Sequence, residues 1–492
     1  MVKKLFCLLL CVVLPLTVFS GCDSSEDAYI YFELTAQPDT LDPQTAETEE
    51  ELLIVKNIFE GLLRKDEEGN IVCGAAENYN KEGLVYTFNI RKDAVWSNGE
   101  RLTAYDFEYG LKRAVDPSTK SPFVSRLFAI KGAEQINGSN ADISTLGVKA
   151  IDENTLEITL IREDTHFENT LTTSVAMPCN RVFFEETSGK YGLLTESILC
   201  NGSYEISRWR KDPFGIRLYR NEKYYGNFAA NNAAVFLTCD EDETPIQRLE
   251  KNSVDMAFIE TAEKTRAENS GLTVREFENI CWVMTISNQF SQNVRKSFAM
   301  LVGGEIYSGS LPDGYSVATS IYPSILGDNS FINGITAYNP EEAKNLYSKE
   351  IDNFENGRFP SDIILYYYDN GYVKNAVTDI VGHWQNHLSA FINIEAVSDS
   401  ELLLSELTDP EYPFAIFPVN AESSEVAEYL KKFGVTYKNE DLSVLQEQIL
   451  KSNNIIPLFF QNTNIAYSDS LDNVIFDYGN GYIDFSFLIK YE

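Results

Sequence analysis

The chain has 492 residues, and 40 Lys and Arg residues against 74 Asp and Glu residues give a net charge of −34. This length exceeds what one ordinary hydrophobic core organises, so we expect two or three domains. Apolar residues make up 44% and charged residues 23%, a composition that argues for a globular protein and against disorder. An acidic surface repels phosphate groups, which argues against nucleic-acid binding and against electrostatic docking on an anionic membrane.

The N-terminus predicts a lipoprotein signal peptide over residues 1–21. Two lysines precede an apolar run over residues 5–19, which is too short for a comfortable transmembrane helix. The run ends in Val-Phe-Ser-Gly-Cys, which resembles a bacterial lipobox in which Cys22 is diacylated and becomes the mature N-terminus. Two acyl chains suffice for stable anchoring on the outer face of the membrane. Ordinary secretion with an unmodified Cys22 is the alternative.

The remaining cysteines carry little information. Of eight cysteines, three lie within residues 1–22, and the odd number left implies at least one free thiol outside the cell. No spacing among them is typical of a metal clip, and the sequence leaves one or two disulfides open without assigning a pair. These five residues are Cys73, Cys179, Cys200, Cys239 and Cys281.

The mature chain opens with a predicted strand over residues 28–35 and a turn. Apolar residues at helical spacing then predict a helix from Leu52 that ends near Lys65. Further along, apolar residues predict a strand pair over residues 148–161. The sequence Asn339-Pro340 followed by two glutamates is typical of a helix start.

Residues 84–117 carry the clearest local pattern in the chain. Alternating apolar side chains over residues 86–90 predict a half-buried strand. The Asn98-Gly99 pair favours a tight turn, because its central residues need positive φ. Thr103, followed three residues later by an aspartate, forms an acidic capping box that predicts a helix over residues 104–115. The stretch contains no catalytic constellation and is therefore scaffold.

Residues 84–117 resemble the signature segment of the extracellular solute-binding proteins of peptide ABC importers, the oligopeptide- and dipeptide-binding family. Further segments that resemble the family are the Leu-Asp-Pro at 41–43, NIFEGLL at 57–63, and residues 201–226 and 481–485. The resemblance covers nearly the whole mature chain. It implies an α/β fold that is periplasmic-binding-protein-like (type II, class C), with two hinged lobes and an inserted extra domain.

The resemblance also implies the domain layout. Domain I is discontinuous and comprises residues 22–44, 165–278 and 465–492. Domain II is the insert over residues 45–164, and domain III, the second ligand-binding lobe, spans residues 279–464. Two chain crossings would make a hinge between domains I and III, which lets the lobes close on a ligand.

One wall of the implied ligand site is Glu47-Thr48-Glu49, which follows the Leu-Asp-Pro turn. The alternative for these residues is a solvated helix start favoured by the helix dipole. Phe123 matches a family aromatic residue that faces the ligand, with ordinary core packing as the alternative.

The other implied wall is the run Val419-Asn420-Ala421-Glu422. Together with the preceding Pro418, which stands where glycine is expected, it matches the family's Gly-Trp-x-Ala-Asp segment, whose aspartate binds the peptide amine. Alanine is kept, Glu422 replaces the aspartate, and Val419 stands where tryptophan is expected. Glu422 can still bind an ammonium group, but the lost tryptophan removes a large pocket wall. The ligand is therefore less well defined than the scaffold.

Enzymatic and metal-binding patterns are weak. His383 and His387 lie four residues apart on a predicted helix, a spacing that can hold zinc, but no glutamate lies between them to act as a general base. No Gly-x-Ser-x-Gly or Gly-x-x-x-x-Gly-Lys sequence occurs. We therefore expect a protein that is not an enzyme, with no catalytic residues, cofactor or metal.

These observations predict a lipid-anchored, extracytoplasmic substrate-binding component of an ABC importer. It would bind short peptides between its lobes through main-chain hydrogen bonds and deliver them to the permease transmembrane subunits. We expect a monomer that is held at the membrane by its N-terminal lipid and binds no nucleic acid. The first alternative keeps the fold with another ligand, such as a nickel chelate, haem, a sugar or a signalling peptide. A secreted hydrolase is a more distant alternative.

Overall fold

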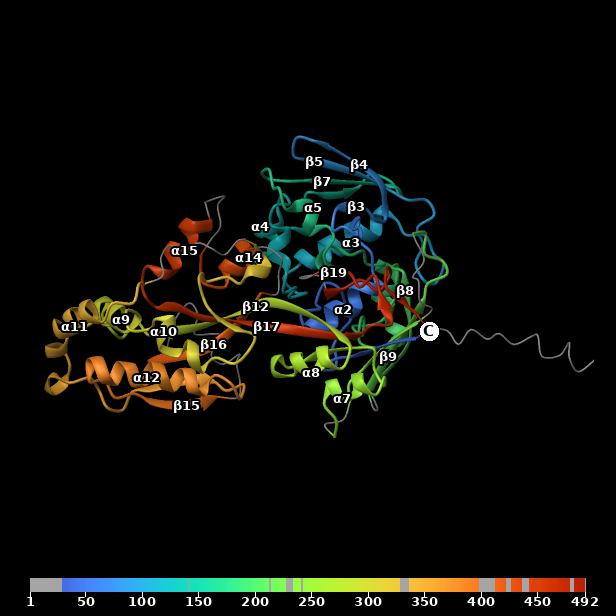
Figure 1. The fold of residues 1–492 in the computed structure, drawn as a ribbon. Helices are drawn as coiled ribbons and strands as arrows, with labels where there is room; N and C mark the ends of the chain where they lie inside the picture. Colours follow the sequence, from blue (N-terminus) through green and yellow to red (C-terminus); the bar gives the residue numbers. More distant parts are fainter. Residues whose placement is uncertain are drawn as a thin grey trace, which may run out of the picture.

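The computed structural model describes residues 29–139, 141–211, 214–226, 233–239, 242–327, 336–397, 412–421, 426–435, 442–477 and 482–491. Two lobes share one large mixed sheet, and two long strands run from one lobe into the other (Figure 1). In spatial order the sheet consists of β15 (Asn393–Val397), β14 (Ile364–Tyr368), β16 (Phe414–Asn420), β12 (Leu272–Ile286), β17 (Ile455–Ser468), β11 (Met256–Ile259), β1 (Tyr29–Glu33), β10 (Ala233–Leu237), β9 (Phe214–Arg220) and β8 (Tyr204–Lys211), with β13 (Tyr315–Val317) beside β17.

Strands β12 and β17 connect the lobes as an antiparallel pair that runs from Leu272 opposite Ser468 to Thr285 opposite Ile455. The burial of β12 changes along its length, from alternating side chains in the first lobe to a continuous buried run in the second. A continuous run of buried residues is typical of a strand that is covered on both faces of its sheet. Successive residues of this run enter two different cores, one on each face of the sheet.

A four-stranded sheet covers one side of the first lobe (Figure 1). Its order is β4 (Ala76–Glu82), β5 (Val85–Ile90), β7 (Thr155–Thr159) and β6 (Val148–Ala150), which confirms the strands predicted near residues 86–90 and 148–161. Helix α3 (Ala104–Val115) packs on this sheet and has the predicted bounds. The Thr103 N–H donates to Asp106 Oδ2 at 2.8 Å, as the capping box requires, and the Thr103 hydroxyl donates to the same oxygen at 2.8 Å. One continuous hydrophobic core extends from this sheet into the first lobe.

Helix α2 (Glu49–Ile58) is shorter than predicted. The expectation that it ends near Lys65 is wrong, because Phe59 is already extended and the chain turns into a hairpin of β2 (Leu63–Lys65) and β3 (Ile71–Cys73). Gly61 passes close to another segment, since a Cβ there would lie 2.5 Å from the Leu171 carbonyl oxygen. This approach leaves no room for a continuing helix with side chains.

The second lobe consists of β14, β15 and β16 with helices on both faces of the sheet (Figure 1). The predicted start of α11 is confirmed, because the Asn339 side chain accepts a hydrogen bond from Glu342 N at 3.0 Å. The helices of this lobe are α9 (Gln292–Ala299), α10 (Gly304–Tyr307), α11 (Pro340–Ser348), α12 (Lys374–Leu388), α14 (Val426–Lys431) and α15 (Leu442–Leu450). Those of the first lobe and insert, besides α2 and α3, are α4 (Ala133–Ser139), α5 (Phe167–Thr170), α6 (Arg181–Glu186), α7 (Pro245–Glu250) and α8 (Lys264–Asn269).

The C-terminal segment returns to the first lobe. It forms short ladders of β18 (Leu471–Asp472) with β21 (Ile489–Lys490) and of β19 (Phe476–Asp477) with β20 (Tyr482–Ile483). The Asn57 side chain binds this segment twice, donating to Ile483 O at 3.0 Å and accepting from Phe485 N at 2.7 Å. Lys490 Nζ donates to Asp255 Oδ2 at 2.9 Å, which ties the end of the chain to the start of β11.

Two features hold for the described residues as a whole. None of the described helices is long and apolar enough to cross a membrane. The five cysteines outside the N-terminal segment, all of them among the described residues, form no disulfide with one another. The predicted signal peptide over residues 1–21 and Cys22 lie outside the described residues.

Candidate functional site

The first predicted wall is held in place by the carboxylate of Glu51. Its Oε1 accepts the backbone N–H groups of Asp39 and Thr40 at 3.1 and 3.0 Å. Its Oε2 accepts those of Glu47 and Thr48 at 2.8 and 3.2 Å. The Thr48 hydroxyl accepts from Glu51 N at 3.3 Å and completes a capping box at the start of α2. Four hydrogen bonds to one buried carboxylate fix the backbone of this segment.

The three residues of this wall differ in exposure. Glu47 and Thr48 are exposed, and Glu49 is half-buried in the first turn of α2. The capping box accounts for Thr48 as a helix start, which was the alternative to a ligand contact. A ligand role for the three residues stays a prediction.

Phe123 lies in the inserted region, immediately before a short 3-10 turn over Val124–Leu127. Its ring is half-buried against the core of the first lobe. The Arg126 guanidinium lies over the ring at 4.4 Å from its centre, a cation–π contact. The ring thus has structural partners on one side, and its predicted contact with a ligand is not tested.

The second predicted wall is the end of β16. The side chains of Val419 and Ala421 are fully buried in a core of the second lobe, whereas Asn420 is exposed. Tyr429 adds a hydrogen bond to the Val419 carbonyl at 3.4 Å. Val419 therefore fills the lobe interior rather than forming an outward wall in place of a tryptophan. Glu422 lies outside the described residues.

The backbone of β16 is open along one edge. Its pairing with β14 runs only from Phe414 to Ile416, whereas its pairing with β12 continues to Asn420. Ala421 N donates to Asn279 O at 2.8 Å on the β12 side. Since successive amides of a strand point to opposite sides, the N–H of Asn420 points away from β12. Past Ile416, no strand in the described part of the chain pairs with this edge.

The open edge adjoins the point where β12 changes lobes. The register of β12 against β17 shifts between Glu278 and Ile280, and a bulge of this kind bends a strand. The buried Asn279 at this bulge accepts the Thr463 N–H at 3.1 Å through its side chain. Glu278 accepts from Ser324 N at 3.0 Å. The Asn279 side chain thus joins β12 to β17 at the bulge, and the carbonyl of the same residue accepts from Ala421 N.

A second contact between the lobes joins Gly314 to Thr261. Gly314 has φ of +77° in the turn before β13, and a Cβ there would clash with Thr261 Cγ2. The Gly314 carbonyl accepts from Asn462 N at 2.9 Å. The Thr261 hydroxyl accepts from Asn464 Nδ2 at 2.8 Å. Glycine is required here both for its φ and for the close approach.

An ion pair that the sequence did not predict joins the N-terminal turn to the insert. Arg113 at the end of α3 donates to both carboxylate oxygens of Asp42, in the Leu-Asp-Pro turn, and to Gln44 Oε1 at 2.6 Å. Asp42 and Arg113 are 5% and 10% exposed, so the pair is nearly buried. The sequence showed Arg113 only as a basic residue in the last turn of a helix.

A buried carboxyl at Glu60 is a second residue that the sequence did not single out. It accepts hydrogen bonds from the hydroxyls of Tyr224 and Tyr225. Burial raises the pKa of Glu60, although the nearby Arg64 and the two hydroxyls favour its charged form. Glu60 lies in the family-like segment 57–63 and the Tyr-Tyr pair lies near the end of the family-like segment 201–226, but nothing in either segment indicated that they meet.

The two histidines of α12 lie side by side, with ring centres 4.2 Å apart. His383 Nε2 lies 2.8 Å from the Tyr338 hydroxyl, and burial together with the neighbouring His387 lowers the pKa of His383. Within the described part of the chain, no three His, Cys, Asp or Glu side chains are close enough to hold a metal ion.

Two lobes that share a sheet through a pair of long strands, with an inserted domain on one lobe, define a periplasmic-binding-protein-like α/β fold. Similarity to known proteins agrees with this class. Residues 70–441 match the family of bacterial extracellular solute-binding proteins, family 5 (middle region), and the chain belongs to this family. The predicted family and fold class are confirmed. Membership also makes the chain a binding protein rather than an enzyme, as predicted.

Two relatives of known name come from Escherichia coli. The periplasmic oligopeptide-binding protein OppA is 34% identical over 249 residues, covering 50% of this chain and 46% of OppA. The probable deoxycholate-binding periplasmic protein YgiS is 33% identical over 243 residues, covering 48% of this chain and 44% of YgiS. The chain therefore matches about half the length of these two relatives.

Among solved structures, the substrate-binding domain of an oligopeptide ABC transporter from Bacillus anthracis superposes with a TM-score of 0.75. The alignment covers 94% of this chain and 99% of that chain at 21% identity. At this identity the likeness shows the fold.

Proposed function

We propose that the chain is the substrate-binding component of a peptide ABC importer and that it binds short peptides between its two lobes by main-chain hydrogen bonds. The observation that carries the proposal is the open edge of β16, which presents the Asn420 N–H and the Pro418 carbonyl beside the connecting strands. A protein that accepts many peptide sequences must bind what they share, namely the backbone and the charged ends. Strand addition to an open edge satisfies the backbone.

The charged amine of the peptide requires a carboxylate. Glu422, two residues after Asn420 in the sequence, would supply one, and a charge-assisted hydrogen bond contributes about 1.5–3 kcal/mol. The fixed segment Glu47–Glu49 would supply the facing wall from the first lobe, with Phe123 at its side. Rigid walls lower the entropy lost on binding.

The membrane side of the proposal rests on the sequence. Cys22 would carry the lipid after removal of residues 1–21, and this anchor would keep the protein on the outer face of the membrane. There it would deliver its peptide to the transmembrane subunits of a permease as a monomer. Incorporation of labelled palmitate into the wild-type protein and its loss in Cys22→Ala test the anchor.

The main-chain mechanism has a matched pair of variants. Asn420→Pro removes the N–H from the open edge and leaves the β12 pairing in place, because that N–H points away from β12. Asn420→Ala keeps the N–H and removes only the side chain. In calorimetry with mixed short peptides, we expect Asn420→Pro to bind roughly fivefold more weakly, because the loss of one hydrogen bond costs about 1 kcal/mol of binding free energy. We expect Asn420→Ala to bind like wild type. Equal affinity in both variants contradicts main-chain binding at this edge.

The amine contact has a test of its own. Glu422→Ala should weaken the binding of peptides with a free amine more than that of N-acetylated peptides. An equal loss for both peptide classes would remove the role assigned to Glu422.

A second candidate keeps the fold and changes the ligand. Two observations favour it: Val419 is buried where a tryptophan wall is expected, and one relative is named as probably deoxycholate-binding. The ligand would then be a nickel chelate, haem, a sugar, a signalling peptide or another small molecule. Mass spectrometry of the ligand that co-purifies under mild conditions separates this candidate from short peptides.

A further inference from the structure

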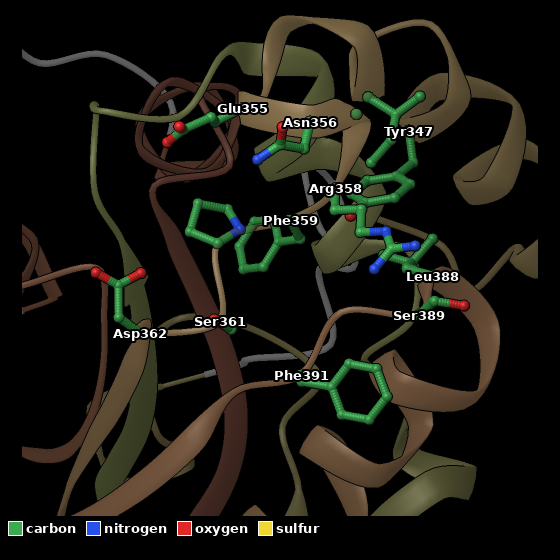
Figure 2. Close-up of a pocket in the computed structure, with 13 residues that line it drawn as sticks. Tyr347, Glu355, Asn356, Arg358, Phe359, Ser361, Asp362, Leu388, Ser389 and Phe391 are labelled. Atoms are coloured by element: carbon green, nitrogen blue, oxygen red, sulfur yellow. The ribbon is translucent and has the colours of Figure 1, made fainter.

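The second lobe contains a cavity of about 910 Å³. It lies between the C-terminal ends of α11 and α12 and the segment that leads from α11 to β14 (Figure 2). Its volume falls within the range of ligand-binding pockets. None of its lining residues belongs to β12, β16 or β17, so it is separate from the proposed interlobe site.

The backbone around this cavity is held in uncommon conformations. Asn356 and Ser389 have φ of +59° and +55°, and both line the cavity. Non-glycine residues seldom adopt positive φ, and such residues cluster at ligand sites. Ser389 ends α12 in this conformation and leaves its side chain at the rim (Figure 2).

A buried hydroxyl in the wall of the cavity has no partner within the described structure. Tyr347 is 6% exposed, and its hydroxyl makes no hydrogen bond there. The ring itself is well packed against aromatic neighbours, including Phe298 and Phe359. Burial raises the pKa of Tyr347 to about 12, so the hydroxyl stays protonated and can donate. A buried donor without an acceptor is unfavourable until a ligand supplies one.

Opposite charges line opposite sides of the cavity. In Figure 2 the Arg358 guanidinium lies beside Tyr347 and Leu388, whereas Glu355 and Asp362 lie on the other side of Phe359. Arg358 is exposed and forms no ion pair with a described residue, in a chain of net charge −34. An unpaired guanidinium with its planar donors suits a carboxylate.

Two aromatic side chains lie among the residues that line the cavity between the charges. Phe359 occupies the middle of the wall, and Phe391 lines the cavity with 60% of its side chain exposed. A large aromatic side chain so exposed at the edge of a cavity offers a surface for an apolar group.

We propose that this cavity is a second binding site, which takes a short zwitterionic peptide with an apolar side chain. The peptide carboxylate binds Arg358 and accepts a hydrogen bond from Tyr347, and the ammonium group lies between Glu355 and Asp362. The apolar side chain packs on Phe359 and Phe391. A ligand with charges at separate ends and an apolar middle matches this order of groups. The site does not depend on the proposed interlobe function.

The test uses the dipeptide leucyl-phenylalanine and its N-acetylated, C-amidated form. Amide hydrogen exchange of the full chain should show protection over residues 351–362 and 388–391 with the free dipeptide and none with the blocked one. Protection confined to β12 and β16 instead would support the interlobe function and overturn the second site. The experiment can therefore contradict the second site without contradicting the proposed interlobe function. Absence of protection over 351–362 at millimolar free dipeptide also overturns the second site.

Variants assign the contacts. Arg358→Gln should weaken the affinity for the dipeptide at this site by roughly tenfold, as measured by the protection over residues 351–362. The matched control is Arg162→Gln, an exposed arginine of the inserted region, which should leave it unchanged. Equal affinity in the two variants contradicts the proposal.

Tyr347→Phe separates a ligand contact from a structural one. Because it removes an unpartnered hydroxyl, the variant should be at least as stable as wild type without peptide and should bind the dipeptide more weakly. A loss of stability with unchanged dipeptide affinity would assign the hydroxyl to the fold and overturn its role in the site.

Discussion

The contact between Gly314 and Thr261 makes a sharp prediction about how the lobes are joined. Replacing Gly314 by alanine places a methyl group where the turn before β13 meets the first lobe. The new Cβ would clash with Thr261 Cγ2, well inside van der Waals contact, and φ is +77°. Both the backbone conformation and the packing disfavour the alanine, and their contributions to the free energy of unfolding can be measured separately.

The magnitude follows from these two terms. An L-residue in the left-handed region costs about 1 kcal/mol. Overpacking by one methyl group costs about 1–3 kcal/mol. We therefore expect Gly314→Ala to lower the free energy of unfolding by about 2–4 kcal/mol. Gly271→Ala is the control for the backbone term alone, because Gly271 has φ of +81° and a Cβ there would have nothing within 4 Å, so this variant should cost about 1 kcal/mol.

The packing term is isolated by Thr261→Ser, which removes Cγ2 and keeps the hydroxyl that accepts from Asn464. In urea unfolding, Thr261→Ser should recover about 1–2 kcal/mol in the Gly314→Ala background and little in the wild-type background. Additive effects of the two substitutions, with no coupling free energy, would refute the contact. A loss in Gly314→Ala no larger than in Gly271→Ala would do the same.

Three further predictions concern other parts of the chain. Asp42→Asn leaves the nearly buried Arg113 without its charge partner and should cost about 3–5 kcal/mol in urea unfolding, whereas Glu163→Gln, at an exposed pair, should cost less than about 1 kcal/mol. Burial raises the pKa of Asp106 from 3.8 to about 6, so folding takes up a proton between these values. The stability of wild type relative to Asp106→Asn should therefore rise as pH falls from about 6 to about 4, and a flat difference would contradict the burial argument. Saturating peptide should decrease the radius of gyration in small-angle scattering, and an unchanged radius would argue against lobe closure.

Elements with local signals were predicted well from the sequence. The alternation of β5, the capping box at Thr103 and the proline start of α11 depend on neighbouring residues, so they can be read without knowing the fold. The end of α2 could not be read in this way. Its apolar spacing continues past Ile58, but the close approach of Gly61 to Leu171 ends the helix.

The candidate site was predicted less completely, since it is built from distant residues. The resemblance to the family led to the segment at Val419, but nothing local indicated that its side chain is buried while the neighbouring edge of β16 is open. Asp42 and Arg113 are 71 residues apart in the chain, so no spacing rule links them. Glu51 was not singled out from the sequence, although its carboxylate fixes four backbone amides.

The position of β17 in the middle of the shared sheet has a consequence for how the protein is made. This strand is among the last to be synthesised, yet it separates β12 from β11 and forms part of both lobes. A nascent chain that stops before it has two unfinished half-sheets with exposed edges, which are prone to pair with other chains. Without β17 neither lobe has its complete sheet, so we expect native structure to form only after the whole polypeptide has been synthesised.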